Sequence, residues 1–216
     1  PWRDLSLLRG LPIETLEVSG GRLENYEVLR QLPLRRLSLI RCQLDNLSML
    51  ASLALEALDV SENRLSTIVS LTGMPLRRLN ISRNSQITTV RNLTGMPLEE
   101  LRMDDCTRIE DLRPLRGLPL KTLSMDGVAV ADLSPLTDLP LEFLNASGCT
   151  QVRDWSPVRS LKQLTELRIR GCGWTDLSLL SGMSLQRLDV SYNRELSNLG
   201  PLRGMKLVSL QAAHTQ

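Results

Sequence analysis

Hydrophobic and polar positions along this chain follow one pattern that returns every 21 to 23 residues. Each unit opens with apolar residues at the spacing L-x-x-L-x-L and continues to a D-L-S-P-L segment or a variant of it, as in residues 120–140, LKTLSMDGVAVADLSPLTDLP. A unit this short cannot bury its own apolar side chains, so we expect it to stack on its neighbours and share one core with them. The first apolar residue of each pattern is the expected start of a strand: Ile13, Leu34, Leu55, Leu76, Leu98, Leu120, Leu141, Leu164, Leu185 and Leu207.

Each unit combines a strand pattern with a turn pattern. The L-x-L segment, such as residues 37–39, alternates apolar and polar residues as a strand does. Strands of successive units can pair, which predicts a parallel sheet along one face. The D-L-S-P-L segment predicts a 3₁₀ or single-turn helix on the opposite face, because it is short and its proline can only open a helical turn. Strands pack only about 4.8 Å apart and the turns are bulkier, so the strand face should be concave.

The uninterrupted series of repeats predicts an α/β solenoid of about ten repeats. No Gly/Ser linker or charge block divides it, so we assign residues 1–216 to a single domain. The opening WRDLSLL of residues 2–8 returns almost unchanged as WTDLSLL at residues 174–180, and residues 213–216 stop in mid-motif. We therefore expect the chain to be a fragment of a longer polypeptide.

Composition limits the classes of partner. Hydrophobic residues make up 42% of the chain but aromatic residues only 3%, so the core should be aliphatic. Charged residues make up 23%, yet the formal net charge is only +2, which argues against a polybasic surface for nucleic acid or lipid headgroups. No stretch approaches the roughly 18 apolar residues that a membrane span needs. We therefore expect neither nucleic acid nor a membrane as a partner.

The four cysteines share one repeat position, which asparagine fills in other repeats, for example at Asn63, Asn84 and Asn193. A thiol suits such a position as a small buried substitute. The spacing contains no C-x-x-C pair, so a metal site is not expected, although two of the cysteines lie in adjacent repeats, close enough in principle for a disulfide. Unpaired thiols favour a reducing compartment, and hence a cytoplasmic location. These residues are Cys42, Cys106, Cys149 and Cys172.

Residues with catalytic chemistry do not form a recognisable constellation. The sole histidine, His214, lies two residues from the end, and no nucleophile is tied to it by spacing. Carboxylates are plentiful, but an open sheet offers no desolvated pocket that would separate their pKa values. Phosphate-binding loops and H-E-x-x-H are absent from the sequence. We expect no catalytic residue, no cofactor and no bound metal.

The recurring L-x-x-L-x-L-x-x-N/C-x-L resembles the leucine-rich repeat, and the resemblance covers essentially the whole chain. The D-L-S-P-L tail resembles the short internalin-type repeat. The fuller sequence pattern, L-x-G-M-P-L-x-x-L with G-C-T-Q-V-x-D, is similar to repeats attached to planctomycete-type bacterial Ser/Thr kinases. Cysteine-containing trypanosomatid repeats are another similar set. The resemblance implies a horseshoe with a concave parallel sheet, a convex face of 3₁₀ or short helical turns, and an inward Asn or Cys that bonds the backbone. No kinase motif is present.

The concave face holds the remaining candidates. It carries large side chains of both signs and one aromatic ring, which a protein-recognition surface can use. The alternative is a solvated face whose charges pair across strands, for example Arg102 with Asp126. We expect the third residue of each strand to be exposed: Glu17, Ser38, Asp59, Asn80, Arg102, Ser124, Asn145, Arg168, Asp189 and Gln211. We expect the centre of a partner-binding surface at Arg102, Asp104, Ser124, Asp126, Phe143, Asn145, Arg168 and Arg170.

The sequence thus favours a protein-interaction module that holds a protein or peptide on its concave sheet. Rigidity would keep the entropy cost of binding low, and mixed charges would set specificity. A regulatory or scaffolding segment of a larger enzyme, such as a Ser/Thr kinase, is the alternative, and a structural spacer is a third reading. Apolar residues near both ends also predict apolar surface there, with either end-to-end self-association or further repeats in the native protein. These residues are Trp2, Leu5, Leu8, Leu207, Leu210 and Ala212.

Overall fold

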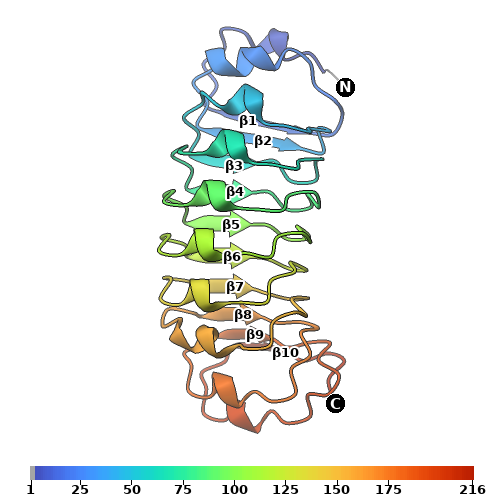
Figure 1. Cartoon of the computed structure of the whole chain (residues 1–216), viewed down its shortest axis with the longest axis vertical. Coiled ribbons are helices and arrows are strands. Elements are labelled where there is room, and N and C mark those ends of the chain that lie inside the picture. Colours follow the sequence, from blue (N-terminus) through green and yellow to red (C-terminus); the bar gives the residue numbers. More distant parts are fainter. Residues whose placement is uncertain (1–2) are drawn as a thin grey trace.

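The computed structural model describes residues 3–216, which form a stack of coils (Figure 1). Within these residues ten parallel strands make one sheet whose order follows the sequence from β1 to β10. The chain ends lie at opposite ends of the stack. The strands are β1 (Thr15–Ser19), β2 (Arg36–Ile40), β3 (Ala57–Asp59), β4 (Arg78–Asn80), β5 (Glu100–Arg102), β6 (Thr122–Ser124), β7 (Phe143–Asn145), β8 (Glu166–Arg168), β9 (Arg187–Asp189) and β10 (Ser209–Gln211).

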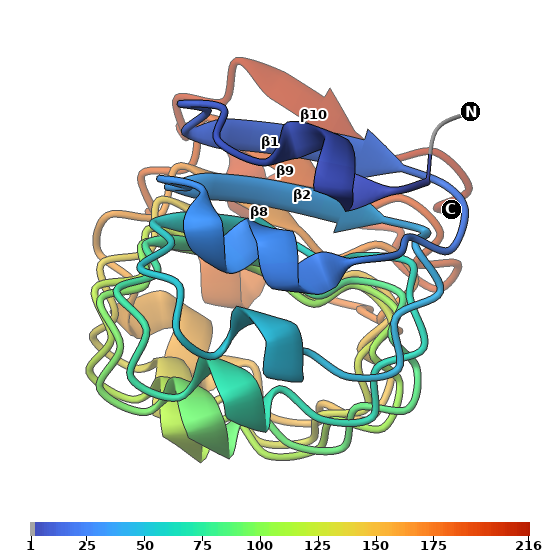
Figure 2. The ribbon, with the colours of Figure 1, turned by 90° about the horizontal axis from the view of Figure 1, so that it is seen from above.

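Short 3₁₀ helices alternate with the strands and line the opposite side of the stack, as the D-L-S-P-L pattern predicts (Figure 1). Seen down the stack, the first and last strands are displaced to the strand side of the green central repeats (Figure 2), so the sheet is the concave face. The helices are η1 (Leu5–Leu8), η2 (Tyr26–Gln31), η3 (Ser48–Leu50), η4 (Val69–Leu71), η5 (Arg91–Leu93), η6 (Arg113–Leu115), η7 (Ser134–Leu136), η8 (Ser156–Ser160), η9 (Ser178–Leu180) and η10 (Gly200–Leu202).

The strands begin two residues later than the leucine pattern predicts. Leu34, for example, is a predicted start, whereas β2 begins at Arg36. The reason lies in the hydrogen bonds that enter the sheet: the amides of Arg35 and Arg36 both donate to the carbonyl of Glu14, at 2.9 and 3.0 Å. This shared acceptor closes a turn before the regular ladder starts, so the first leucine of the pattern belongs to the turn.

A side-chain oxygen caps most of the convex helices. In the D-L-S-P-L segment of residues 132–136, Oδ1 of Asp132 accepts the amide of Ser134 at 2.7 Å, just before Pro135. The same contact occurs at nine of the ten helices of the described chain. In each, an Asp, Asn or Thr side chain accepts the amide of the residue two positions later. The polar residue of this motif therefore satisfies a backbone donor that a helix start leaves open.

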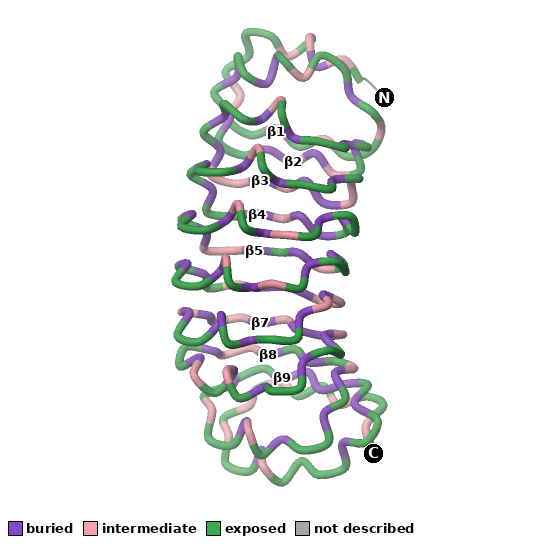
Figure 3. Tube along the Cα trace, in the orientation of Figure 1, coloured by how far each residue is buried: buried purple, intermediate pink, exposed green. Residues whose placement is uncertain are grey.

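The core is a column of aliphatic side chains that runs the length of the stack, and buried stretches recur in every coil (Figure 3). The central strand residues Leu101, Leu123 and Leu144 are fully buried. Each such leucine contributes roughly 1.5–3 kcal/mol to the free energy of unfolding. One aromatic pair interrupts the aliphatic column, where the rings of Trp155 and Trp174 meet edge to face with centroids 5.2 Å apart.

The shared asparagine and cysteine position points inward, as predicted. Asn84 is fully buried; its Oδ1 accepts the amide of Leu65 at 3.1 Å, and its Nδ2 donates to the carbonyls of Val60 and Ile81. The thiol of Cys149 makes the corresponding contact with one carbonyl, that of Met125, at 3.2 Å. All four cysteines are buried and free. The prediction that they are small buried substitutes for asparagine is therefore confirmed.

The residue before this position turns the chain out of the sheet with a positive φ in all ten repeats of the described chain. Glycine fills it at Gly20, Gly127, Gly148 and Gly171. Tyr192 adopts φ 64° and Asp105 φ 58°, a conformation that costs side-chain-bearing residues free energy. The turn thus places large or charged side chains along the edge of the concave face.

Candidate functional site

The concave face is built from the outward residues of the strands and of the turns that follow them. The first and third residue of each strand point outward while the second enters the core, because side chains alternate along a strand. The register aligns equivalent residues across the whole sheet, so each strand position forms a row.

An arginine–phenylalanine contact lies in the C-terminal half of this face. The guanidinium of Arg168 in β8 lies 5.1 Å from the ring centroid of Phe143 in β7. Its Nη2 also donates to Oε1 of Glu166 at 2.7 Å. Arg187 of β9 approaches the second oxygen of Glu166 at 3.6 Å. Phe143 is therefore half-buried under charged groups and is less exposed than the sequence suggests.

Arg102 pairs within its own strand. Its Nε donates to Oε1 of Glu100 at 2.7 Å, where the two residues stand side by side on the outward face of β5. The expected alternative, a pair between Arg102 and Asp126, is not formed. Asp126 follows β6 and lies beyond the strand row that Arg102 occupies, so the glutamate two residues away is the nearer partner.

Ser124 corrects the expectation of an exposed third strand position. It is only 5% exposed, and its Oγ donates to Oδ1 of Asp104 at 2.6 Å and accepts from Nδ2 of Asn145 at 3.1 Å. Asp189 is buried for a similar reason, since its Oδ1 accepts the amide of Ser191. Short polar side chains at these positions bond to neighbouring strands and turns rather than to solvent.

Three carboxylates gather where the chain leaves β5 and β6. Oδ1 of Asp104 accepts the amide of Asp126 at 2.8 Å, and Asp105 pairs with Arg83 at 3.4 Å. Burial raises the pKa of Asp126, and the charges of Asp104 and Asp105 raise it further. Arg170 and a hydrogen bond from Asn145 act in the opposite direction. The centre of the concave face is therefore acidic.

Arg170 belongs to a separate group of contacts at the C-terminal corner. Its Nε lies 3.6 Å from Oδ2 of Asp189, and its guanidinium lies 5.1 Å from the ring centroid of Tyr192. Tyr192 is 46% exposed and stacks on His214 with centroids 4.7 Å apart. Tyrosine and arginine are the residue types that dominate many binding interfaces.

The eight candidate residues thus divide into four groups of contacts. Asp104, Ser124, Asp126 and Asn145 share one polar network, whereas the three arginines belong to separate pairs. The sequence interpretation did not place the partners Glu100 and Glu166 in the site. The sequence could have indicated these two pairs, because each glutamate lies two residues before an arginine in the same strand and so on the same face.

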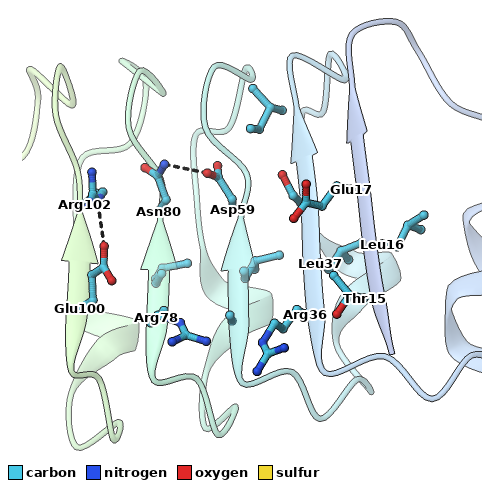
Figure 4. A pocket seen from close by; sticks show the side chains of 15 residues that line it. Thr15, Leu16, Glu17, Arg36, Leu37, Asp59, Arg78, Asn80, Glu100 and Arg102 are labelled. Atoms are coloured by element: carbon cyan, nitrogen blue, oxygen red, sulfur yellow. Dashed lines mark hydrogen bonds and ion pairs between the residues drawn. The ribbon is translucent and has the colours of Figure 1, made fainter. Parts of the chain in front are cut away.

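A hollow of about 470 Å³ opens in the N-terminal half of the face, and of the predicted centre only Arg102 lines it. Figure 4 shows its charged lining, with Arg36 and Arg78 near the start of their strands and Glu17 and Asp59 nearer the strand ends. Asn80 donates to Oδ2 of Asp59 at 2.8 Å. Glu100 and Arg102 also line the hollow but pair with each other. The remaining charges make it cationic at one end and anionic at the other.

Both ends of the stack carry apolar surface, as predicted, but partly from other residues. Leu5 is fully buried, whereas Leu7 is 69% exposed. At the other end Val208 is 81% and Leu210 42% exposed. Leu8, Leu207 and Ala212 are half-buried, and Trp2 lies outside the described residues.

Neither a membrane helix nor a metal-binding cluster forms in residues 3–216. None of their helices has the length and apolar character needed to cross a bilayer. No three or more His, Cys, Asp or Glu side chains of this range are grouped so as to hold a metal ion.

Solved structures share this architecture. The internalin InlF of Listeria monocytogenes superimposes with a TM-score of 0.76 over 94% of this chain and 68% of its own, at 24% identity. The chain folds as an internalin-like leucine-rich-repeat solenoid. Internalin C2 of the same species matches with a TM-score of 0.64 and 22% identity, over 93% of this chain and 80% of its own.

A more distant leucine-rich-repeat neighbour is the functional domain of Listeria InlJ, which includes a cysteine ladder. It has a TM-score of 0.52 and 17% identity, over 94% of this chain and 54% of that domain. No protein-family model and no curated protein sequence matches the chain. The internalin-type repeat expected from D-L-S-P-L therefore agrees with the solved structures, which are related in fold.

Proposed function

We propose that the chain is a protein-interaction module that binds a protein or peptide partner on its concave face. The contact between Arg168 and Phe143 carries this proposal. An aromatic ring half-covered by a guanidinium 5.1 Å away offers a flat apolar surface beside a positive charge. A partner side chain can use both, at a cost of only about 0.5–1 kcal/mol for the exposed cation–π contact.

The residues around this contact support a binding surface of moderate size. Arg102, Asp104, Asp126 and Arg170 surround it with both signs of charge, and the solenoid holds them rigidly through the sheet. Preorganised side chains lose little entropy when a partner binds. Ser124 and Asn145 contribute by fixing Asp104 and the neighbouring strands, since Ser124 is buried.

The test is to change Arg102, Phe143 and Arg168 to alanine together and to compare the proteins that the wild type and the variant retain from a cell extract. We expect partners held by the wild type to be lost, because truncating interface anchors commonly costs about 2 kcal/mol or more each. Circular dichroism and urea unfolding would show that the variant is folded.

A matched control is available on the convex face. The triple variant Arg91→Ala, Val69→Ala, Arg116→Ala also removes two exposed arginines and one exposed apolar side chain. It should retain the same partners as the wild type. Partners that persist equally in the concave and convex variants would contradict the proposed binding face.

A further inference from the structure

Two arginines on the concave face differ from the others. The strands carry five arginines in all, and three of them, Arg102, Arg168 and Arg187, pair with glutamates of the same face. The guanidinium groups of Arg36 and Arg78 make no ion pair or hydrogen bond with any residue that the structure describes. Both side chains are exposed, so they offer unused donors at the surface.

The register places these two arginines on either side of one small residue. Arg36 aligns with Ala57, and Ala57 aligns with Arg78. Their backbones are therefore about 10 Å apart, which is twice the spacing between strands. In Figure 4 both guanidinium groups lean from opposite sides toward β3, the strand that carries Asp59. The short side chain of Ala57 leaves the space between them open.

The neighbouring carboxylate does not neutralise this pair. Glu100 aligns with Arg78 in the next strand, but its Oε1 is engaged by Nε of Arg102 at 2.7 Å. A carboxylate from elsewhere can reach Arg36 and Arg78 without displacing an existing partner. Guanidinium groups bind carboxylates through paired, charge-assisted hydrogen bonds, so two of them make a strong site for one acidic group.

Two carboxylates, opposite in charge to this arginine pair, lie two residues further along the strands in the same hollow. Glu17 and Asp59 occupy the third strand row, two residues beyond the row of Arg36 and Arg78. Asn80 and Ser61 hold Asp59 in place through hydrogen bonds of 2.8 and 2.6 Å. Two residues along a strand span about 6.6–6.8 Å, so the hollow presents a positive and a negative site at that separation.

We propose that this hollow binds an extended segment of the partner protein that carries an acidic and a basic residue two positions apart. Arg36 and Arg78 grip the acidic side chain above Ala57, and Glu17 with Asp59 receives the basic side chain. Alternate side chains of an extended peptide have the same spacing and the same direction as the two rows. This inference rests on the proposed function and adds a second contact region to it.

The test uses the peptide acetyl-Gly-Glu-Ala-Arg-Gly-amide as a probe and follows the side-chain Nε–Hε signals of the arginines by NMR. We expect the signals of Arg36 and Arg78 to shift on titration. A peptide with Gln in place of Glu should bind about tenfold more weakly or worse, because it loses the charge-assisted hydrogen bonds. The double variant Arg36→Gln, Arg78→Gln should lose binding to the same extent.

The matched control is Arg91→Gln, Arg116→Gln, which removes the same charge from exposed convex positions and should bind like the wild type. Equal binding of the Glu and Gln peptides, or an equal loss in both double variants, would overturn the inference. Shifts confined to Arg102 and Arg168 would also overturn it while leaving the proposed function intact. Failure of the proposed function itself is read separately, from the partners retained by the concave triple variant.

Discussion

At the scale of single residues, the same repeat position serves different ends according to its side chain. Asn84 uses both ends of its amide to bind four backbone groups, whereas Cys149 donates its one thiol to one carbonyl. Burial raises the pKa of Cys149 to about 12, so its thiol stays protonated and remains a donor at neutral pH. Burial also raises the pKa of Cys106 and Cys172 to about 11. These cysteines are structural groups, because nucleophilic chemistry requires the thiolate.

Asp126 provides a prediction for pH dependence. Its raised pKa means that its ionised form destabilises the fold at neutral pH, where burial and the charges of Asp104 and Asp105 oppose it. This destabilisation is relieved as the pH falls through the folded pKa, and it vanishes below the ordinary value of 3.8. Asp126→Asn should therefore raise the free energy of unfolding at pH 7 by up to about 1 kcal/mol, and the gain should shrink toward pH 4. Urea unfolding at several pH values measures both effects.

The same amide substitution at Asp132, which caps an exposed convex turn, serves as a control. Asparagine can still accept the amide of Ser134, so the free energy of unfolding should change little. A gain for Asp126→Asn that is constant from pH 7 to pH 4 would contradict the electrostatic explanation.

The sequence identified the inward residues of the site region more reliably than the outward ones. The burial of Asn84 and Cys149 could be predicted because both residues occupy the same inward position of the repeat. Ser124 was expected to be exposed because its strand position is outward, yet it is buried by bonds to Asp104 and Asn145. Those partners lie about one repeat away on either side, and which of them a serine contacts depends on side-chain conformations that the repeat pattern does not contain.

At the scale of elements, the turn that leaves each strand shows how tightly the coils approach. Gly148 has φ +64°, and a Cβ there would lie 3.2 Å from Oδ1 of Asp126 and 3.2 Å from the amide nitrogen of Gly127. Gly171 has a similar φ of +60°, but its Cβ would meet only the Cβ of Tyr192 at 4.0 Å. Glycine is therefore required at residue 148 both because a Cβ would be too close to its neighbours and because φ is positive.

Alanine substitutions separate these two causes. Gly171→Ala should lower the free energy of unfolding by about 1 kcal/mol, the cost of a left-handed conformation for a residue with a Cβ. Gly148→Ala should cost roughly 2–3 kcal/mol, because the Asp126 side chain and the Gly127 backbone must also move. Urea unfolding of both variants provides the comparison. Equal losses in the free energy of unfolding would show that the neighbours of Gly148 move aside without cost.

The boundaries of the elements were harder to predict from the sequence than their types. The leucine spacing correctly predicted strands and 3₁₀ turns, but it placed each strand start two residues too early. In the internal repeats the first leucine of the pattern is as buried as the others, as at Leu55 and Leu76, so its hydrophobicity alone cannot show that it lies in a turn. The shared carbonyl acceptor that ends the turn is a backbone feature.

At the scale of the whole molecule, repetition makes the fold predictable and leaves the ends exposed. Strand order, parallel pairing and curvature all follow from stacking one unit on the next, and the solved internalin structures have the same solenoid. Internal coils are covered on both sides by their neighbours. Within residues 3–216, β10 pairs with β9 alone, so the other side of β10 presents unpaired backbone groups together with apolar side chains.

We expect this edge to support end-to-end association between copies of the chain. Val208 and Leu210 form its exposed apolar part, and Leu7 and Leu11 are exposed at the opposite end of the stack. Such a contact joins different surfaces of two copies, so it can continue from copy to copy. Analytical ultracentrifugation should show a mean mass that rises with concentration, and Val208→Lys with Leu210→Lys should keep the protein monomeric. Val69→Lys, at an exposed apolar site on the convex face, should leave association unchanged. A wild-type protein that stays monomeric at high concentration and binds no hydrophobic dye would contradict this expectation, and would mean that the polar groups around the edge suffice to keep it in solvent.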